Sequence, residues 1–443
     1  MTLRTLALTL SILLSPALVR AADWTNVVLL YADDLGWGDV GFNGRTQWAT
    51  PNLDKLASQG TVFKRWYTAG VVCAPSRGAM LTGKYTIHSG VSRNNEDLPA
   101  AEITLAEALK SRGYATALFG KWHHGAPRDG ATTYVHPMDQ GFDAFFGFTN
   151  ATHAWQKFPK ELWEGRSLKP VSGHSDDLFA DHAIDFIAKN KKRPFFLYVP
   201  FINSHFNIEA PADEVALHAG KFAEKDPTKP LNATYAAMVT RLDKNVGRVL
   251  SALDTNELAE STLVIFTSDH GATFEKGNLG TSNFHDSNGP FRGQKRTLWE
   301  GGIRVPAVVR WPGQVRSGKV SEEVIHMTDL FPTVFSATVR AHPEPSWNVD
   351  GRNVLEAWRG KSSIPERTLF WEWRSEGIDQ LAAMNGRFKI VATNGGKAEL
   401  FDVVADPAER RNIVAENPKI AQNLEIELKA WLATERKDGS KNQ

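Results

Sequence analysis

The chain has 443 residues and a formal net charge of +1, and 42% of its residues are hydrophobic. A chain of this length can bury one large core and a smaller second one. The balanced charge argues against nucleic-acid or acidic-membrane partners, and a single cysteine, Cys73, excludes an internal disulfide framework.

Residues 1–21 have the pattern of a secretory signal peptide. Arg4 gives a short positive region, and residues 5–19 form a Leu-rich run that is short for a membrane span. We expect cleavage after Ala21 or Ala22, export to the periplasm or the medium, and no stable membrane insertion. The alternative is an uncleaved N-terminal anchor.

The first predicted strand covers residues 26–32, a continuous apolar and β-branched run typical of a buried parallel strand. It ends in Asp33 and Asp34. Adjacent carboxylates repel each other unless a cation lies between them, and carboxylate oxygens are ligands of Ca²⁺ and Mg²⁺. The alternative is a solvated turn.

A helix is predicted over residues 50–57, and a second helix near Cys73. Pro75 suits the first turn of a helix, so Cys73 lies at a helix N-terminus, where free N–H groups favour an anion. Arg77 adds a positive charge one turn later. A lone cysteine is more often a small buried residue than a nucleophile, and the spacing to Arg77 does not match a Cys-dependent phosphatase loop.

The middle of the chain continues the alternation of helices and strands. A helix over residues 104–112 precedes a strand over residues 114–119, which leads into Lys121 and His123. An apolar segment follows at residues 141–148, and His153 comes soon after it. Residues 155–174 lack periodicity and are expected to form loops over the site, and residues 176–189 form an amphipathic helix.

Two further strands also end in polar residues. Residues 194–200 precede His205, and residues 262–268 precede Asp269 and His270. A long helix is predicted between them, over residues 231–253, and the polar stretch 272–290 is expected to be a loop near the substrate. Lys295 follows, then a strand over residues 305–311. The last helix of the main domain begins within residues 328–333.

The C-terminal part changes character after the Pro-rich stretch 342–345 and the loop that runs to residue 365. Short antiparallel strands are predicted at 368–373, 380–384, 388–393 and 399–404, and a closing helix at 415–434. We therefore expect a main domain over residues 22–345 and a subdomain over residues 366–443.

The predicted architecture is an α/β fold: a large mixed, mostly parallel sheet sandwiched by helices, with a small C-terminal antiparallel-sheet subdomain. In open α/β sheets, ligands bind beyond the carboxyl ends of the strands. If the four polar-ended strands are parallel and adjacent, their terminal residues converge at one edge.

Several motifs resemble one family. Cys-x-Pro-Ser-Arg at 73–77 with Leu-Thr-Gly at 81–83, Gly-Lys-Trp-His at 120–123, and Gly-x-Lys with Trp-Glu-Gly-Gly-x-Arg-x-Pro at 293–306 are similar to segments of the type I sulfatases. These are the formylglycine-dependent, arylsulfatase-like members of the alkaline phosphatase superfamily. The tail resembles their C-terminal subdomain, including Glu-Leu-Phe-Asp and Asp-Pro-Ala-Glu within 399–409.

The resemblance implies a metal site and a modified residue. Asp33, Asp34, Cys73, Asp269 and His270 would bind Ca²⁺, with Mg²⁺ as the second choice. His270 stands where Asn is commonest in the family, and imidazole is a less usual ligand of a hard cation. Cys73 would be oxidised to formylglycine by a formylglycine-generating or sulfatase-maturing enzyme, and the hydrated aldehyde would be the nucleophile.

The resemblance also implies the roles of the other polar side chains. Lys121 and Lys295 would contact the sulfate, and Arg77 would help them to offset the developing charge. His123 would take a proton from the remaining hydroxyl of the diol, and Asp269 would be the base for attack. Protonation of the leaving alcohol falls to His205 or Lys295, His205 also contacts the substrate, and His153 lines the pocket.

The predicted function is hydrolysis of sulfate esters on a sulfated carbohydrate, with release of inorganic sulfate. Trp122, Trp155 and Trp163, in predicted loops, are compatible with a sugar ligand. One alternative is a phosphodiester or phosphonate monoester hydrolase of the same superfamily. Another is a carbohydrate-binding pseudoenzyme, inactive because Cys73 is not matured.

Overall fold

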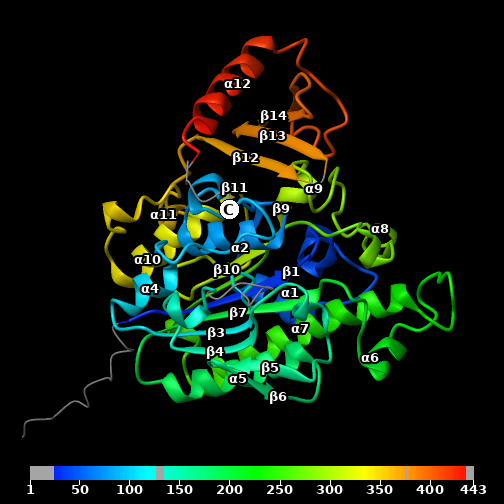
Figure 1. Cartoon of the computed structure of the whole chain (residues 1–443), viewed down its shortest axis with the longest axis vertical. Helices are drawn as coiled ribbons and strands as arrows, with labels where there is room; N and C mark the ends of the chain where they lie inside the picture. Colours follow the sequence, from blue (N-terminus) through cyan, green and yellow to red (C-terminus); the bar gives the residue numbers. More distant parts are fainter. Residues whose placement is uncertain (1–23, 126–133, 376, 436–443) are drawn as a thin grey trace, which may run out of the picture.

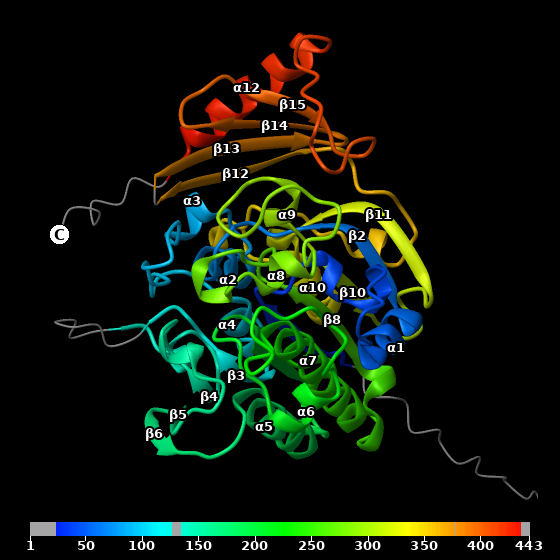
Figure 2. The same ribbon diagram turned by 90° about the vertical axis from the view of Figure 1, so that its right-hand side faces the viewer.

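Two β-sheets of unequal size organise the chain (Figures 1 and 2). The computed structural model describes residues 24–125, 134–375 and 377–435, so the predicted signal peptide lies outside the described residues. The large sheet runs in the order β11 (Lys319–His326), β2 (Thr61–Tyr67), β10 (Ala307–Arg310), β8 (Thr262–Ser268), β1 (Asn26–Asp33), β7 (Phe195–Ser204), β3 (Ala115–Lys121), β4 (Ala144–Phe148), β5 (Glu161–Glu164) and β6 (Ser167–Pro170), and β9 (Arg304–Val305) pairs with β2.

The centre of this sheet is parallel. β8, β1, β7, β3 and β4 are neighbours that all run in the same direction. All eight residues of β1 are buried, and successive side chains enter opposite cores: Val28 and Leu30 pack on one face, and Val27 and Leu29 on the other. A strand buried on both faces explains why β1 is a continuous apolar run.

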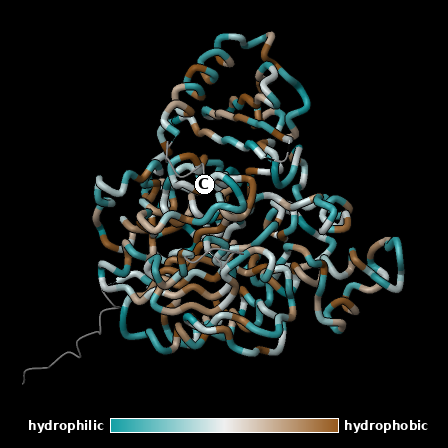
Figure 3. Tube along the Cα trace, in the orientation of Figure 1, coloured by the Kyte–Doolittle hydropathy of each residue, from teal (hydrophilic) through white to brown (hydrophobic). Residues whose placement is uncertain are grey.

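Helices cover both faces of the large sheet. One face carries α1 (Pro51–Gln59), α5 (Ser175–Asn190) and α7 (Leu231–Thr255), and the other carries α2 (Cys73–Thr82), α4 (Leu105–Lys110), α10 (Leu330–Val339) and α11 (Leu355–Trp358). Shorter helices are α3 (Thr86–Ser89), α6 (Ala212–Ala216), α8 (Thr281–Phe284) and α9 (Glu300–Ile303). Hydrophobic residues gather along the central strands (Figure 3). No helix among the described residues is both long and apolar enough to span a bilayer.

The second sheet is antiparallel and lies at one end of the molecule (Figure 1). It consists of β12 (Thr368–Ser375), β13 (Ile378–Asn385), β14 (Phe388–Thr393) and β15 (Glu399–Asp402). α12 (Pro418–Leu432) packs on one face. The other face packs against Leu298, Trp299 and Ile303, in the segment that follows Lys295. The predicted fold class, a large mostly parallel sheet with a small antiparallel one, is confirmed.

Three local predictions were wrong. Residues 155–174 are not all loop, because β5 and β6 form a hairpin that extends the sheet beside β4. The strand expected over residues 305–311 is divided at Pro306 into β9 and β10, since proline has no N–H for the ladder. The loop expected over residues 272–290 contains α8.

Candidate active site

The polar residues at the ends of the central strands meet at one edge of the large sheet. Asp33 is the last residue of β1 and Lys121 the last of β3. His205 directly follows β7, and Asp269 directly follows β8. Since these four strands are adjacent and parallel, their carboxyl ends lie together. The structure therefore brings together the strand ends that the sequence predicts to converge.

Cys73 lies inside this group, at the first position of α2. Its Sγ is 3.4 Å from Asp33 Oδ1 and 3.4 Å from His270 Nε2. Asp33, Asp34, Cys73 and His270 are all buried, and each offers one atom such that all four atoms lie within 4.8 Å of one another. We call these four residues the acidic cluster.

The geometry of His270 suits a metal ligand. Its Nδ1 is 3.0 Å from the carbonyl oxygen of Gly271, while Nε2 is 3.4 Å from Asp34 Oδ1. A metal-binding histidine commonly donates its other ring N–H to such a carbonyl, which fixes the free nitrogen toward the ion. Asp269 is adjacent, with Oδ1 3.5 Å from His270 Nε2.

Two buried lysines flank the acidic cluster. Lys121 Nζ donates to Asp33 Oδ2 at 2.6 Å. Lys295 Nζ donates to both carboxylate oxygens of Asp34, at 3.0 and 3.1 Å. Each lysine thus pairs with one of the two adjacent aspartates of the acidic cluster.

Arg77 lies on α2, one turn beyond Cys73, and is fully buried. Its Nη2 donates to Asp269 Oδ2 at 3.0 Å and lies 3.5 Å from Asp33 Oδ1. Its Nη1 donates to the carbonyl oxygen of Lys121 at 3.0 Å. Arg77 therefore connects the ends of three strands.

Two histidines complete the candidate site. His205 Nε2 is 3.9 Å from Asp34 Oδ2. His123 is within hydrogen-bonding reach of the Cys73 thiol, and its backbone has a left-handed φ of 69°. Burial, reinforced by Lys121, lowers the pKa of His123 to about 4, so this imidazole is neutral at pH 7 and can accept a proton.

The buried ionisable groups shift the pKa values of one another. Burial opposes ionisation of the Cys73 thiol, but Lys121 and Lys295 hold its pKa well below the ordinary value. Burial raises the pKa of Asp269 well above the usual carboxylate range. Burial alone would lower the pKa of His270, but Asp269 and Cys73 raise it to about 9. The acidic cluster offers carboxylate oxygens, a sulfur and an imidazole nitrogen around one point, so the residues fit a bound divalent cation.

One predicted site residue lies apart from this arrangement. His153 belongs to a short 3₁₀ helix, His153–Trp155, and its ring packs edge-on against Phe148 with 4.8 Å between centroids. Its role in lining a substrate pocket stays a prediction.

Two supporting residues were not found from the sequence. The carboxylate of Asp176 accepts the backbone N–H groups of Ile202 and Asn203 at 3.0 and 3.2 Å, and Lys157 Nζ donates to the carbonyl of Ile202 at 2.8 Å. Both side chains are buried and hold the end of β7 that leads to His205. Neither follows a strand in the chain, so no sequence signal marks them.

The fold and this constellation together define an alkaline phosphatase-like hydrolase. Residues 25–339 match the Sulfatase family, and residues 291–438 match the family described as N-sulphoglucosamine sulphohydrolase, C-terminal. The chain belongs to the sulfatase family and is a sulfuric ester hydrolase.

Known relatives agree with this assignment. The chain is 31% identical to the steryl-sulfatase of Mus musculus over 88% of this chain and 78% of that protein. It is 33% identical to the N-acetylgalactosamine-6-sulfatase of Canis lupus familiaris over 82% of this chain and 71% of that protein. The crystal structure of Ps i-CgsB in complex with k-i-k-neocarrahexaose superimposes with a TM-score of 0.83 at 27% identity, covering 94% of each chain. The phosphonate monoester hydrolase of Agrobacterium radiobacter shares the fold, with a TM-score of 0.67 at 20% identity over 93% of this chain and 96% of that one.

Proposed function

We propose that this sulfatase removes sulfate from a sulfated carbohydrate, with residue 73 as nucleophile. The observation that carries the proposal is the position of Cys73 in the acidic cluster, between the lysines that pair with Asp33 and Asp34. The names of two relatives support the substrate class, since one acts on N-acetylgalactosamine 6-sulfate and another binds a neocarrahexaose.

Cys73 requires conversion to formylglycine for this role, by a maturing enzyme of the host. A serine or cysteine sulfate ester would hydrolyse slowly, whereas the aldehyde hydrate has a second hydroxyl whose deprotonation expels sulfate. Neutral His123, within reach of residue 73, takes that proton. Asp269 is the base for the first attack.

The acidic cluster, with Asp269, would hold a divalent cation, and Ca²⁺ is the better candidate because three of these side chains offer carboxylate oxygens. A cation bound there would supply Lewis-acid polarisation of the sulfate. Arg77 pairs with Asp33 and Asp269 and orients both carboxylates.

The lysines and His205 act on the substrate. Lys121 and Lys295 turn from their carboxylate partners toward the sulfate oxygens and stabilise the charge that develops in the transition state. His205 protonates the leaving sugar oxygen, and Lys295 is the second candidate for this step.

An aromatic rim beside His205 supports a sugar substrate. The Phe206 ring lies 4.2 Å from the His205 ring, and the Trp155 ring lies 5.3 Å from the Phe206 ring. Trp155 is 37% exposed, so part of its indole is open to a substrate. This rim is compatible with a sugar, and the choice of carbohydrate over a small aryl sulfate rests on the names of the relatives.

We also propose how the chain is exported and divided into domains. Residues 1–21 direct export, residues 22–345 form the catalytic domain, and residues 366–443 form the C-terminal subdomain. The substrate is then an extracellular or periplasmic sulfated glycan.

A comparison of esters tests the reaction class. Sulfate, phosphate and phosphonate monoesters of one alcohol are incubated with the matured protein, and kcat/KM is measured for each. The sulfate ester should be preferred by at least tenfold. Preference for the phosphonate would favour the alternative function, phosphonate monoester hydrolysis. The fold that this chain shares with a phosphonate monoester hydrolase supports that alternative. Aldehyde at residue 73 by peptide mass spectrometry, without turnover of any ester, would favour a carbohydrate-binding pseudoenzyme.

A further inference from the structure

A separate cavity lies at the amino ends of the central strands, whereas the candidate active site lies at their carboxyl ends. Its volume is about 560 Å³, and its lining includes Thr25 and Ser261, the residues directly before β1 and β8. β1 has eight residues. At about 3.3 Å per residue, the cavity lies about 25 Å from the end of β1 that carries Asp33. We call it the rear cavity.

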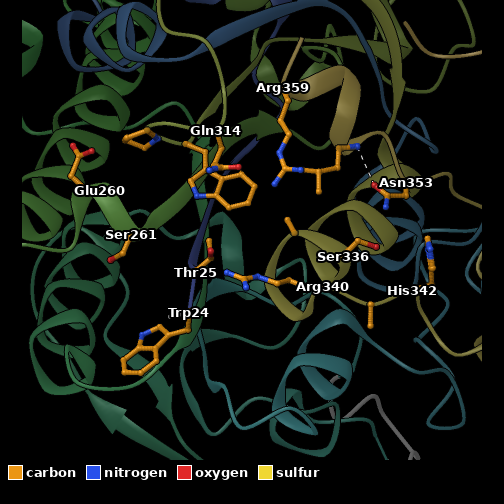
Figure 4. Close-up of a pocket in the computed structure, with 15 residues that line it drawn as sticks. Trp24, Thr25, Glu260, Ser261, Gln314, Ser336, Arg340, His342, Asn353 and Arg359 are labelled. Atoms are coloured by element: carbon orange, nitrogen blue, oxygen red, sulfur yellow. Dashed lines mark hydrogen bonds between the residues drawn. The ribbon is translucent and has the colours of Figure 1, made fainter. Parts of the chain in front are cut away.

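Two arginines reach into the rear cavity from different elements (Figure 4). Arg340 directly follows α10, and Arg359 directly follows α11. Arg359 Nη1 donates to Glu356 at 2.8 Å, but its Nε is buried without a hydrogen-bond partner among the described residues. No carboxylate pairs with Arg340 within the part of the chain that the structure describes. Two guanidinium groups thus line one cavity, and both retain unpaired N–H donors among the described residues.

Arg340 holds this position in an unfavourable backbone conformation. Its φ is 56°, in the left-handed region where glycine or asparagine usually ends a helix. Nine other non-glycine residues of the described chain share a positive φ, so this conformation does not by itself indicate a ligand. The alternative is that Arg340 only offsets the negative end of the α10 dipole, which needs no ligand.

The other walls suit a ring-shaped, anionic ligand. The Arg359 guanidinium lies 5.6 Å from the ring centroid of Trp311, and Trp24 lines the cavity from the other side. The hydroxyl of Ser336 is buried and has no partner among the described residues. Of the residues that line the cavity, Glu260 is the one acid, against Arg340, Arg359 and His342.

We infer that the rear cavity is a second, non-catalytic binding site for a sulfate group, either free or carried by a saccharide. Guanidinium groups recognise oxyanions, and the Trp24 indole adds a surface on which a sugar can stack, whereas Trp311 is buried against Arg359. The choice of sulfate among oxyanions rests on the proposed function, whereas the anionic character of the ligand rests on the cavity alone.

Equilibrium dialysis with radiolabelled inorganic sulfate tests the site, with Cys73→Ala as the background so that no turnover interferes. The number of sulfates bound per chain is compared with that of Arg340→Gly/Arg359→Gln. Glycine suits the left-handed backbone at 340, so this variant removes both guanidinium groups without adding strain there. We expect one fewer sulfate per chain, or at least a tenfold weaker second site.

The matched control is Arg410→Gln/Lys419→Gln, which removes the same charge from exposed positions of the C-terminal subdomain and should leave binding unchanged. Equal stoichiometry and affinity in the Arg340 and Arg359 variant would overturn the inference, and because no activity is measured, this result would leave the proposed function standing.

Glucose 6-sulfate in place of sulfate separates the two sources of the ligand. Tighter binding that Trp24→Ala reduces to the level of free sulfate identifies a saccharide ligand. Equal affinities, unchanged by Trp24→Ala, identify free sulfate. Either result supports the site.

Discussion

At the scale of single residues, the candidate site depends on how buried charges are paired. Asp33, Asp34 and Asp269 are almost completely buried, a state that carboxylates tolerate only beside cations. Lys121, Lys295 and Arg77 provide those partners from three different parts of the chain. Removing one partner leaves a buried charge uncompensated. This lowers the free energy of unfolding more than replacing both partners by apolar residues would.

Arg77→Ala tests this point. The substitution should lower the free energy of unfolding on the order of 3 kcal/mol, because Asp269 loses its guanidinium partner in a buried environment. Thermal unfolding measures the effect, with Arg410→Ala, at an exposed position, as control. An unfolding midpoint equal to that of the control would contradict the pairing scheme.

His205→Gln tests the assignment of the proton donor. Loss of a general acid should lower kcat by roughly 10²-fold for a sugar sulfate, whose leaving alcohol needs a proton. An aryl sulfate, with a better leaving group, should lose much less. His153→Gln serves as comparison and should affect both substrates alike. Equal losses in His205→Gln would assign the proton to another residue, Lys295 first.

At the scale of the elements, continuous apolar runs were predictable and mixed strands were not. β1, β3, β7 and β8 are buried on both faces, so their composition alone indicates a strand. β2 contains Lys64 and Arg65, and β11 lies at the sheet edge with Glu322 and Glu323, so neither shows such a run.

The same reasoning applies to the site. The polar residues that follow apolar strands could be predicted, because parallel strand ends converge. Asp176 and Lys157 could not, because they act on Ile202 through contacts 26 and 45 residues away in the chain. Such contacts exist only once the fold is formed.

The C-terminal sheet is tied to the main domain by a buried ion cluster. Lys389, on β14, pairs with Glu300 at 3.1 Å and Glu409 at 2.9 Å. Glu300 begins α9, a few residues after Lys295. The subdomain therefore supports the segment that delivers Lys295 to Asp34.

Glu409→Gln should change how the unfolding free energy of the protein depends on pH. Burial raises the pKa of Glu409 from 4.5 to about 7, although Lys389 lowers it. Between these values the folded state binds more protons than the unfolded state, so wild-type stability falls as pH rises through the window. The glutamine amide does not titrate. The unfolding free energy of the variant, relative to that of the wild type, should therefore increase by up to roughly 3 kcal/mol as pH rises through this window.

Thermal unfolding across this pH range measures the difference, with Glu427→Gln, on an exposed position of α12, as control. A difference between variant and wild type that does not change with pH would show that Glu409 does not titrate in this window.

At the scale of the whole molecule, one sheet joins the proposed metal site and the two cores. The acidic cluster lies where the central strands end, so a cation bound there would stabilise the arrangement of β1, β8 and α2 together. A ligand at 100 times its Kd adds about 2.7 kcal/mol to the unfolding free energy.

Chelation tests whether the protein requires a divalent cation. EDTA should abolish sulfate release and lower the unfolding midpoint, and Ca²⁺ should restore both more effectively than Mg²⁺. Asp34→Asn, which weakens the cluster, should show a smaller response to the chelator. Full activity after exhaustive chelation, confirmed by metal analysis, would exclude a required cation.

The central claim is that residue 73, converted to an aldehyde within the acidic cluster, hydrolyses sulfate esters. The most direct measurement is release of inorganic sulfate from a panel of sulfated saccharides by protein whose residue 73 is an aldehyde by peptide mass spectrometry. We predict multiple turnovers on at least one saccharide and none with Cys73→Ala. Equal sulfate release by Cys73→Ala, or by protein that retains the thiol, would contradict the account.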